Sequence, residues 1–203
     1  MAGTDLLVAL AGQPNVGKST VFNLLTGLSQ HVGNWPGKTV EKKEGFYVTD
    51  GRKIKIVDLP GSYSLTAYSE EEKIARDFII NERPDAIVLI ANASAVERSL
   101  YLLAEFLLLN VPVIVALNMM DVAERQGIRI DVGLLEKYLG VPVVPMVASK
   151  NQGIKLLVSA ILMPVMSPSR PRTAFQSPPE RRRRARHGQP RKTSAPIMAK
   201  ISK

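Results

Sequence analysis

The chain has 203 residues, of which 45% are hydrophobic and 22% charged, enough for one globular domain with a substantial core. Residues 1–166 hold 16 basic and 17 acidic residues, whereas residues 167–203 hold the other 11 basic residues and one acidic residue. The net charge of +9 therefore describes the end of the chain and does not indicate a basic nucleic-acid-binding domain. Because the chain has no cysteine, disulfides and thiolate metal sites are excluded.

Neither a signal peptide nor a membrane span is expected. Residues Met1–Asp5 carry no basic segment, and the apolar run that follows them is short. The most apolar stretch, Tyr101–Met120, is interrupted by Glu105, Asn110 and Pro112. It predicts a buried helix followed by a buried strand, and the chain is expected to be soluble.

Short apolar runs alternate along the chain with longer helical patterns. Strands are predicted at Leu6–Ala11, Glu44–Val48, Lys53–Val57, Ala86–Ala91, Val111–Leu117 and Val143–Val147. Helices are predicted at Gly17–Thr26, Glu70–Asn81, Ala95–Leu109, Val132–Leu139 and Gly153–Met163. This alternation predicts an α/β fold with a mostly parallel six-stranded sheet and helices on both faces.

Two further features complete the predicted organisation. Asp50-Gly51, between two alternating segments, predicts a hairpin that adds one antiparallel strand, and the Gly- and Pro-containing stretch Leu28–Lys38 is expected to be irregular. After residue 166, six prolines and a run of four arginines accompany little apolar surface. Residues 1–166 are therefore predicted to form one domain, and residues 167–203 a basic disordered tail.

A glycine-rich segment follows the first predicted strand and precedes the first predicted helix. Its residues, Gly12, Gln13, Pro14, Asn15, Val16, Gly17, Lys18 and Ser19, fit the phosphate-loop pattern G-x-x-x-x-G-K-[ST], and Thr20 comes next in the helix. In this context the backbone N–H groups and the positive end of the helix surround phosphates. Lys18 is expected at the β- and γ-phosphates and the hydroxyl of Ser19 at Mg²⁺.

A second element ends the second strand of the hairpin and consists of Asp58, Leu59, Pro60 and Gly61. A carboxylate at this edge of a sheet can hold Mg²⁺ through water, and the N–H of Gly61 can sense the γ-phosphate. In a chain with a phosphate loop, this tetrapeptide is predicted to be the second metal-binding element.

A third element, Asn118-Met119-Met120-Asp121, follows another buried strand. The carboxylate of Asp121 can accept both N1–H and the N2 amine of guanine, which adenine does not offer, and Asn118 is expected to tie this loop to the phosphate loop. Many GTPases have lysine where this chain has Met119, whose apolar side chain can make the same contact with the base. The element predicts selection of GTP over ATP, and with it a phosphate-loop GTPase fold.

Across residues 4–165 the chain resembles the cytosolic GTPase domain of the FeoB ferrous-iron transport family. The resemblance is carried by Gly12–Thr20, Gly33–Gly37 (Gly-Asn-Trp-Pro-Gly), Thr39–Glu41, Asp58–Gly61, Tyr68–Asp77, Glu97–Leu102 and Leu139–Pro145. The Asn-Trp-Pro-Gly loop is far more specific to this family than the phosphate loop is.

The resemblance implies roles for several further residues. Thr39 completes the Mg²⁺ shell with Ser19 and Asp58, and Gly37 and Lys38 lie beside it at the nucleotide. A K⁺ ion is implied against the phosphates, coordinated by Asn15 and by the backbone carbonyls of Gly33 and Trp35. Such a cation neutralises charge that develops between the β- and γ-phosphates. The residues implied in catalysis are thus Lys18, Thr39, Gly61 and Asn15.

Departures from the family pattern affect turnover and affinity. Ser62 stands where many GTPases carry a water-orienting glutamine, which predicts slow hydrolysis. In the last guanine loop, Val147-Ala148-Ser149, Val147 lacks the hydroxyl usual at that place, while Ala148 is expected to offer its N–H to guanine O6. Asn92 replaces a usual aspartate. The family also continues into a helical spacer and a membrane permease domain that carries the iron path, and both are missing here.

Three functions remain open from the sequence. The leading one is a slow, K⁺-stimulated GTP-hydrolysing regulatory domain at the cytoplasmic side of the membrane, with the permease domain or its spacer as partner. The second is an Era-like ribosome- or RNA-associated GTPase. The third is a nucleotide-binding interaction module without useful hydrolysis. The tail is expected to be a solvated charge run, with RNA or an anionic membrane surface as the alternative partners.

Overall fold

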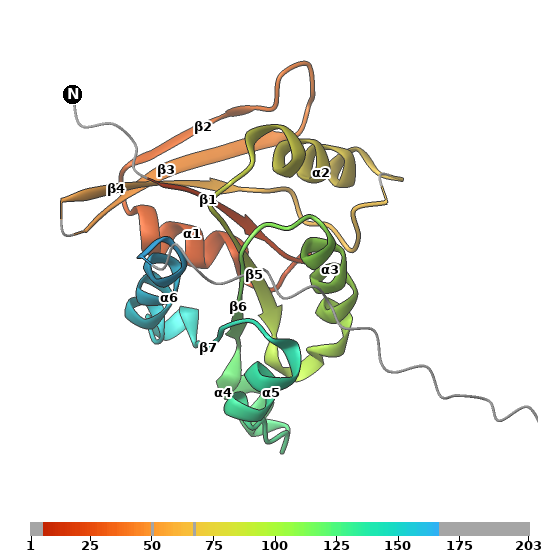
Figure 1. The fold of residues 1–203 in the computed structure, drawn as a ribbon, viewed down its shortest axis with the longest axis vertical. Helices are drawn as coiled ribbons and strands as arrows, with labels where there is room; N and C mark the ends of the chain where they lie inside the picture. Colours follow the sequence, from red (N-terminus) through yellow and green to blue (C-terminus); the bar gives the residue numbers. More distant parts are fainter. Residues whose placement is uncertain (1–5, 50, 67, 167–203) are drawn as a thin grey trace, which may run out of the picture. The chain divides into compact units, whose positions relative to one another are not determined.

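The computed structural model describes residues 6–49, 51–66 and 68–166, in which one β-sheet lies between two layers of helices (Figure 1). The strands are β1 (Leu6–Ala11), β2 (Gln30–Asn34), β3 (Glu41–Thr49), β4 (Arg52–Asp58), β5 (Ala86–Asn92), β6 (Val113–Asn118) and β7 (Val143–Pro145). The α-helices are α1 (Lys18–Thr26), α2 (Glu70–Glu82), α3 (Glu97–Leu108), α4 (Met120–Arg125), α5 (Val132–Leu139) and α6 (Ile154–Met166). Two short 3₁₀ turns, η1 (Ala93–Ala95) and η2 (Ala148–Lys150), lie among them.

The strand order is β2-β3-β4-β1-β5-β6-β7. β3 is antiparallel to β2 and to β4, and the remaining neighbours pair in parallel. The predicted mostly parallel sheet with one antiparallel strand and helices on both faces is therefore confirmed. The parallel order places the carboxyl ends of β1, β4, β5, β6 and β7 along one edge, where ligands of such sheets bind.

The predicted number of six strands is wrong, because part of the stretch expected to be irregular forms β2. The side chains of β2 are exposed or half-buried, so the strand leaves no hydrophobic alternation in the sequence. It forms because its backbone pairs with β3, with His31 opposite Glu44 and Gly33 opposite Lys42. The short helix α4 was also not expected from the sequence.

Each face of the sheet is covered by its own set of helices. On β1, Val8 and Leu10 face the core that α1 and α6 cover, whereas Ala9 and Ala11 face the core that α2 and α3 cover. Because both faces of the central strands are buried, β1 and β5 are apolar at nearly every position. Figure 1 shows α1 and α6 on one side of the sheet and α2 and α3 on the other.

The described part of the chain ends at Met166, the last residue of α6, and the domain boundary at residue 166 stays a prediction. The predicted tail, residues 167–203, lies outside the described residues, so its disorder remains a prediction. Among the helices that the structure describes, none is both long and apolar enough to cross a membrane.

Candidate nucleotide-binding site

The phosphate-loop segment leaves the carboxyl end of β1 and ends where α1 begins, at Lys18. Two of its glycines have backbone angles and surroundings that exclude a side chain. Gly12 has φ +148° and a Cβ there would lie 2.5 Å from the carbonyl oxygen of Ile90, while Gly17 has φ +92° and a Cβ would collide with the amide of Asn118. The loop can therefore pack against β5 and β6 and present its backbone N–H groups at the edge of the sheet.

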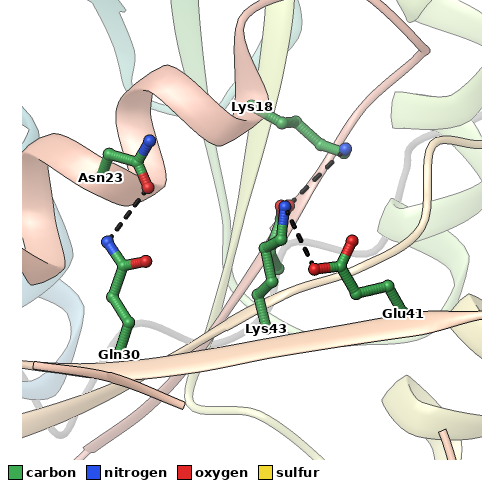
Figure 2. A network of polar contacts seen from close by, with 6 residues as sticks. Lys18, Asn23, Gln30, Glu41 and Lys43 are labelled. Carbon is green, nitrogen blue, oxygen red and sulfur yellow. Dashed lines mark hydrogen bonds and ion pairs between the residues drawn. The ribbon is translucent and has the colours of Figure 1, made fainter. Parts of the chain in front are cut away.

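Lys18 and Asp58 meet at this edge. The ammonium of Lys18 lies 3.6 Å from Oδ1 of Asp58, and both side chains are largely buried. Burial raises the pKa of Asp58, and the positive charge of Lys18 acts in the opposite direction. Figure 2 shows Lys18 extending from the start of α1 beside the ion pair of Lys43 with Glu41. On β3, Lys43 lies directly opposite Asp58.

The residues at this edge suit a magnesium ion. Oδ1 of Asp58 is buried without a hydrogen-bond partner, and Ser19 lies in the first turn of α1, next to Lys18. Within residues 6–49, 51–66 and 68–166, no group of three histidine, cysteine or acidic side chains could hold a metal by itself. This fits Mg²⁺, which is usually held by nucleotide phosphates together with one or two protein oxygens.

The Asp58–Gly61 loop lies against the phosphate loop. The N–H of Leu59 donates to the carbonyl of Leu10 (2.9 Å), and the N–H of Ser62 donates to that of Gly12 (3.2 Å). A Cβ on Gly61 would lie 3.1 Å from the ring of Pro14. The hydroxyl of Ser62 is buried without a hydrogen-bond partner, so this side chain does not face a water at the edge of the sheet.

Asn118 connects three loops. Its amide nitrogen donates to the carbonyl of Val16 (3.0 Å), and its amide oxygen accepts the N–H of Ala148 (3.0 Å). Asn118 thus fixes the loop after β6 to the phosphate loop and to the loop after β7. The expectation that Ala148 offers its N–H to guanine O6 needs correction, because that N–H is already bonded to Asn118. The next N–H along the chain is that of Ser149, in η2.

Asp121 lies beside a cation that the sequence analysis did not include in the site. Its Oδ2 is 3.1 Å from the ammonium of Lys150 and 3.9 Å from the guanidinium of Arg125. The hydrogen bond from Lys150 lowers the pKa of Asp121, and the positive charges of Lys150 and Arg125 add to this effect. The signal in the sequence was a lysine directly after Val147-Ala148-Ser149, the last loop at the same edge.

Two polar residues at the carboxyl edge of the sheet have structural partners. The amide of Gln13 donates to the carbonyl of Arg98 at 2.5 Å, so its side chain anchors the phosphate loop to the start of α3. Asn92 accepts hydrogen bonds from the N–H and the hydroxyl of Ser94, each at 2.9 Å, and caps η1. The side chain of Gln13 therefore holds the phosphate loop in place, and only the backbone of this residue is left to contact phosphate.

The Gly33–Thr39 segment packs against α2. Asn34 pairs with Glu41, two residues beyond the pair of Lys43 with Asp58, so the segment begins at the carboxyl edge of β4. The indole of Trp35 lies in a cavity lined by Leu7 and Phe78. The carbonyl of Trp35 accepts the N–H of Lys38 (2.9 Å), and Thr39 is exposed. In this conformation the carbonyl of Trp35, an implied ligand of K⁺, is engaged within its own segment.

A glycine phosphate loop between β1 and α1, a buried aspartate at the end of β4, and the loops that Asn118 joins define a G-domain of the phosphate-loop class. Comparison with known proteins gives the family. The model of the family described as ferrous iron transport protein B matches residues 6–161. The chain belongs to the FeoB family and corresponds to its amino-terminal G-domain, as the resemblance in the sequence had indicated.

The curated relatives are much longer than the matched segment. The Fe(2+) transporter FeoB of Salmonella typhimurium is 49% identical over 160 residues, and that of Escherichia coli K12 is 48% identical. In both comparisons the match covers 77% of this chain and 21% of the relative. The chain therefore matches about one fifth of the length of these transporters.

Solved structures of the family have the same fold. The FeoB G-domain from Methanococcus jannaschii has a TM-score of 0.71 and 50% identity, over 80% of this chain and 98% of that one. The cytosolic domain of T. maritima FeoB in GDP form II has a TM-score of 0.78 and 44% identity, over 81% and 65% of the two chains. The GMPPNP form of that domain has a TM-score of 0.75 and 46% identity, over 78% and 63%.

Proposed function

We propose that the chain binds GTP and GDP with Mg²⁺ and hydrolyses GTP slowly, as the regulatory domain of a ferrous-iron transport system. The observation that carries the proposal is the bridge that Asn118 makes between the phosphate loop and the two loops expected at the guanine base. Relatives solved in GDP and GMPPNP forms support the choice of nucleotide. Displacement of labelled GDP by GTP but not by ATP, together with phosphate release from GTP, tests it.

For each proposed contact with the phosphates and Mg²⁺, a residue of this chain is available. Lys18, now paired with Asp58, would turn to the β- and γ-phosphates, and the backbone N–H groups of Gly12–Thr20 would surround them. Mg²⁺, when bound, balances phosphate charge, with Ser19, Asp58 and Thr39 as its protein oxygens. The N–H of Gly61 would follow the γ-phosphate. Because the hydroxyl of Ser62 is buried, no side chain at that position orients water, and turnover would be slow.

At the base, Asp121 would accept N1–H and the N2 amine, Met119 would cover one side, and Ser149 would donate its N–H to O6. We further propose that Lys150 braces the carboxylate of Asp121. The ammonium of Lys150 lies 3.1 Å from Oδ2, and it belongs to the loop that Asn118 holds through Ala148. A carboxylate oxygen has two lone pairs, so Lys150 and the base can share it.

Replacing Lys150 should change the pH dependence of GDP binding. GDP needs the ionised carboxylate of Asp121, so affinity is lost as the pH falls through its pKa. Lys150 lowers this pKa below 3.8, its ordinary value, and in Lys150→Met the loss should therefore begin at a higher pH. Labelled-GDP affinity measured from pH 7 downward checks this. Lys155→Met, which removes an exposed lysine from α6, is the control, and identical profiles for the two variants would contradict the brace.

The transport role rests on the family. We propose that the domain acts at the cytoplasmic side of the membrane and that its partner is the permease domain of the system or the helical spacer beside it. The family assignment favours this role over that of an Era-like RNA-associated GTPase. An interaction module without hydrolysis is the remaining alternative. The buried hydroxyl of Ser62 is compatible with it, and phosphate release decides between the two.

Deleting residues 167–203 should leave GDP affinity and GTP turnover unchanged. All residues proposed at the nucleotide precede Lys155, and residues 1–166 are nearly neutral without the basic tail. Binding of RNA or anionic vesicles, if the tail provides it, should disappear in the deletion variant and weaken with salt. Loss of nucleotide turnover on deletion would show that the domain boundary at residue 166 is misplaced.

A further inference from the structure

The indole of Trp35 is packed in a defined seat against α2. Its side chain is 8% exposed, and its ring meets that of Phe78 in α2 edge-on, with centroids 5.6 Å apart and an interplanar angle of 79°. The ammonium of Lys42 lies 5.3 Å from the centre of the indole ring. Leu7 and Val57 line the same cavity, of about 440 Å³. We call these four residues, Leu7, Lys42, Val57 and Phe78, the Trp35 seat.

Helix α2 also holds the same segment at a second point. The ammonium of Lys38 lies 2.9 Å from a carboxylate oxygen of Glu70, in the first turn of α2. Between the two points the backbone forms a closed turn, in which the N–H of Trp35 donates to the carbonyl of Val40 at 3.0 Å. Thr39 lies inside this turn. Its neighbour Lys38 is the residue that pairs with α2.

One polar group of the indole, its N–H, has no hydrogen-bond partner in the seat. Nε1 of Trp35 is buried and has no hydrogen-bond partner. A tryptophan that stays buried normally finds an acceptor for this N–H, because leaving it unpaired opposes burial. Here aromatic packing and the nearby ammonium favour the seated state, while the unpaired N–H opposes it. Because these contributions to the free energy of the seated state oppose each other, we expect that the indole can leave the seat.

We propose that α2 holds the segment 30–40 away from the nucleotide through the Trp35 seat, and that Phe78 is the positioning residue of this restraint. The proposal rests on the proposed function, in which Thr39 and the carbonyls of Gly33 and Trp35 reach Mg²⁺ and K⁺. While the indole is seated, the carbonyl of Trp35 is bonded to the N–H of Lys38 and the segment is held against α2. Because α2 follows the Asp58–Gly61 loop in the chain, the restraint links the two loops that border the γ-phosphate.

The emission of Trp35 reports the seat directly, because this is the only tryptophan of the chain. In the 203-residue chain, GMPPNP with Mg²⁺ and K⁺ should move the emission to longer wavelength, whereas GDP should leave it unchanged. In Phe78→Leu the longer-wavelength emission should be present without nucleotide. The ratio of GMPPNP affinity to GDP affinity should rise by about threefold to tenfold, the strength of an aromatic pair.

Two variants separate this role from loss of packing. Phe106→Leu makes the same change at a fully buried phenylalanine of α3, and it should lower stability while emission and nucleotide preference stay at wild-type values. Phe78→Tyr keeps the ring and should behave as wild type. Equal emission of the wild type with GDP and with GMPPNP, or an unchanged affinity ratio in Phe78→Leu, would overturn the proposal. Failure of the proposed function would give a different result from failure of this proposal, because the wild type and all variants would then bind neither nucleotide.

Discussion

Asp121→Asn should abolish the preference of the protein for guanine and weaken GDP binding by more than about a hundredfold. The carboxylate accepts two N–H groups of the base, and each hydrogen bond to a charged acceptor contributes roughly tenfold or more to affinity. An asparagine side chain keeps one acceptor and turns its NH₂ toward the N2 amine, so a donor faces a donor. Xanthine carries a carbonyl in place of that amine, and its nucleotides should therefore bind the variant better than GDP does.

For the wild type, the measurement is displacement of a labelled guanine nucleotide by GDP, ATP or xanthosine diphosphate. For the variant, the same competitors displace a labelled xanthine nucleotide. Asp77→Asn removes an exposed carboxylate from α2 and is the matched control. The structure supports the assignment by placing Asp121 next to the loop that Asn118 fixes, beside Lys150. Equal competition by ATP and GTP against the wild type would refute it.

GTP hydrolysis should be faster in KCl than in NaCl at equal ionic strength, by about tenfold or more, the scale of one group that stabilises transition-state charge. In the proposed site, the side chain of Asn15 is the ligand for K⁺ that the phosphate loop itself would provide. Removing it should eliminate the difference between the salts and leave a slow basal rate. The other two proposed ligands are carbonyls of Gly33 and Trp35, so assembly of the site would require Trp35 to leave its seat.

The backbone at Asn15 decides which variant is informative. Asn15 has φ +65°, in the left-handed region that glycine adopts without strain and alanine does not. Asn15→Gly therefore removes the side chain with least disturbance of the loop, and any extra loss in Asn15→Ala measures strain. Asn23→Ala, in α1, is the control for loss of an exposed asparagine. Equal wild-type rates in both salts would contradict the K⁺ assignment.

The sequence was sufficient for the features that depend on local pattern. The buried strands β1, β5 and β6 show continuous apolar runs, and α2 has a serine cap with three glutamates after it. The phosphate loop, the Asp58 loop and the Asn118 loop each follow one of the strands, so the rule that parallel strands end at one edge brought them together. Periodicity and spacing predict these features because each one depends on residues of a single strand, helix or loop.

Tertiary structure decided what depends on partners distant in the chain. β2 exists because β3 offers it backbone hydrogen bonds, and its exposed side chains contain no sign of this pairing. The N–H of Ala148 is taken by Asn118, thirty positions earlier, and Lys150 reaches Asp121 from a different loop. Trp35 lies against Phe78 because the ring of Phe78 and a cavity beside α2 accept the indole. Each of these side chains takes the position of lowest free energy among its neighbours. Those neighbours are distant in the chain and come together only when the whole chain has folded.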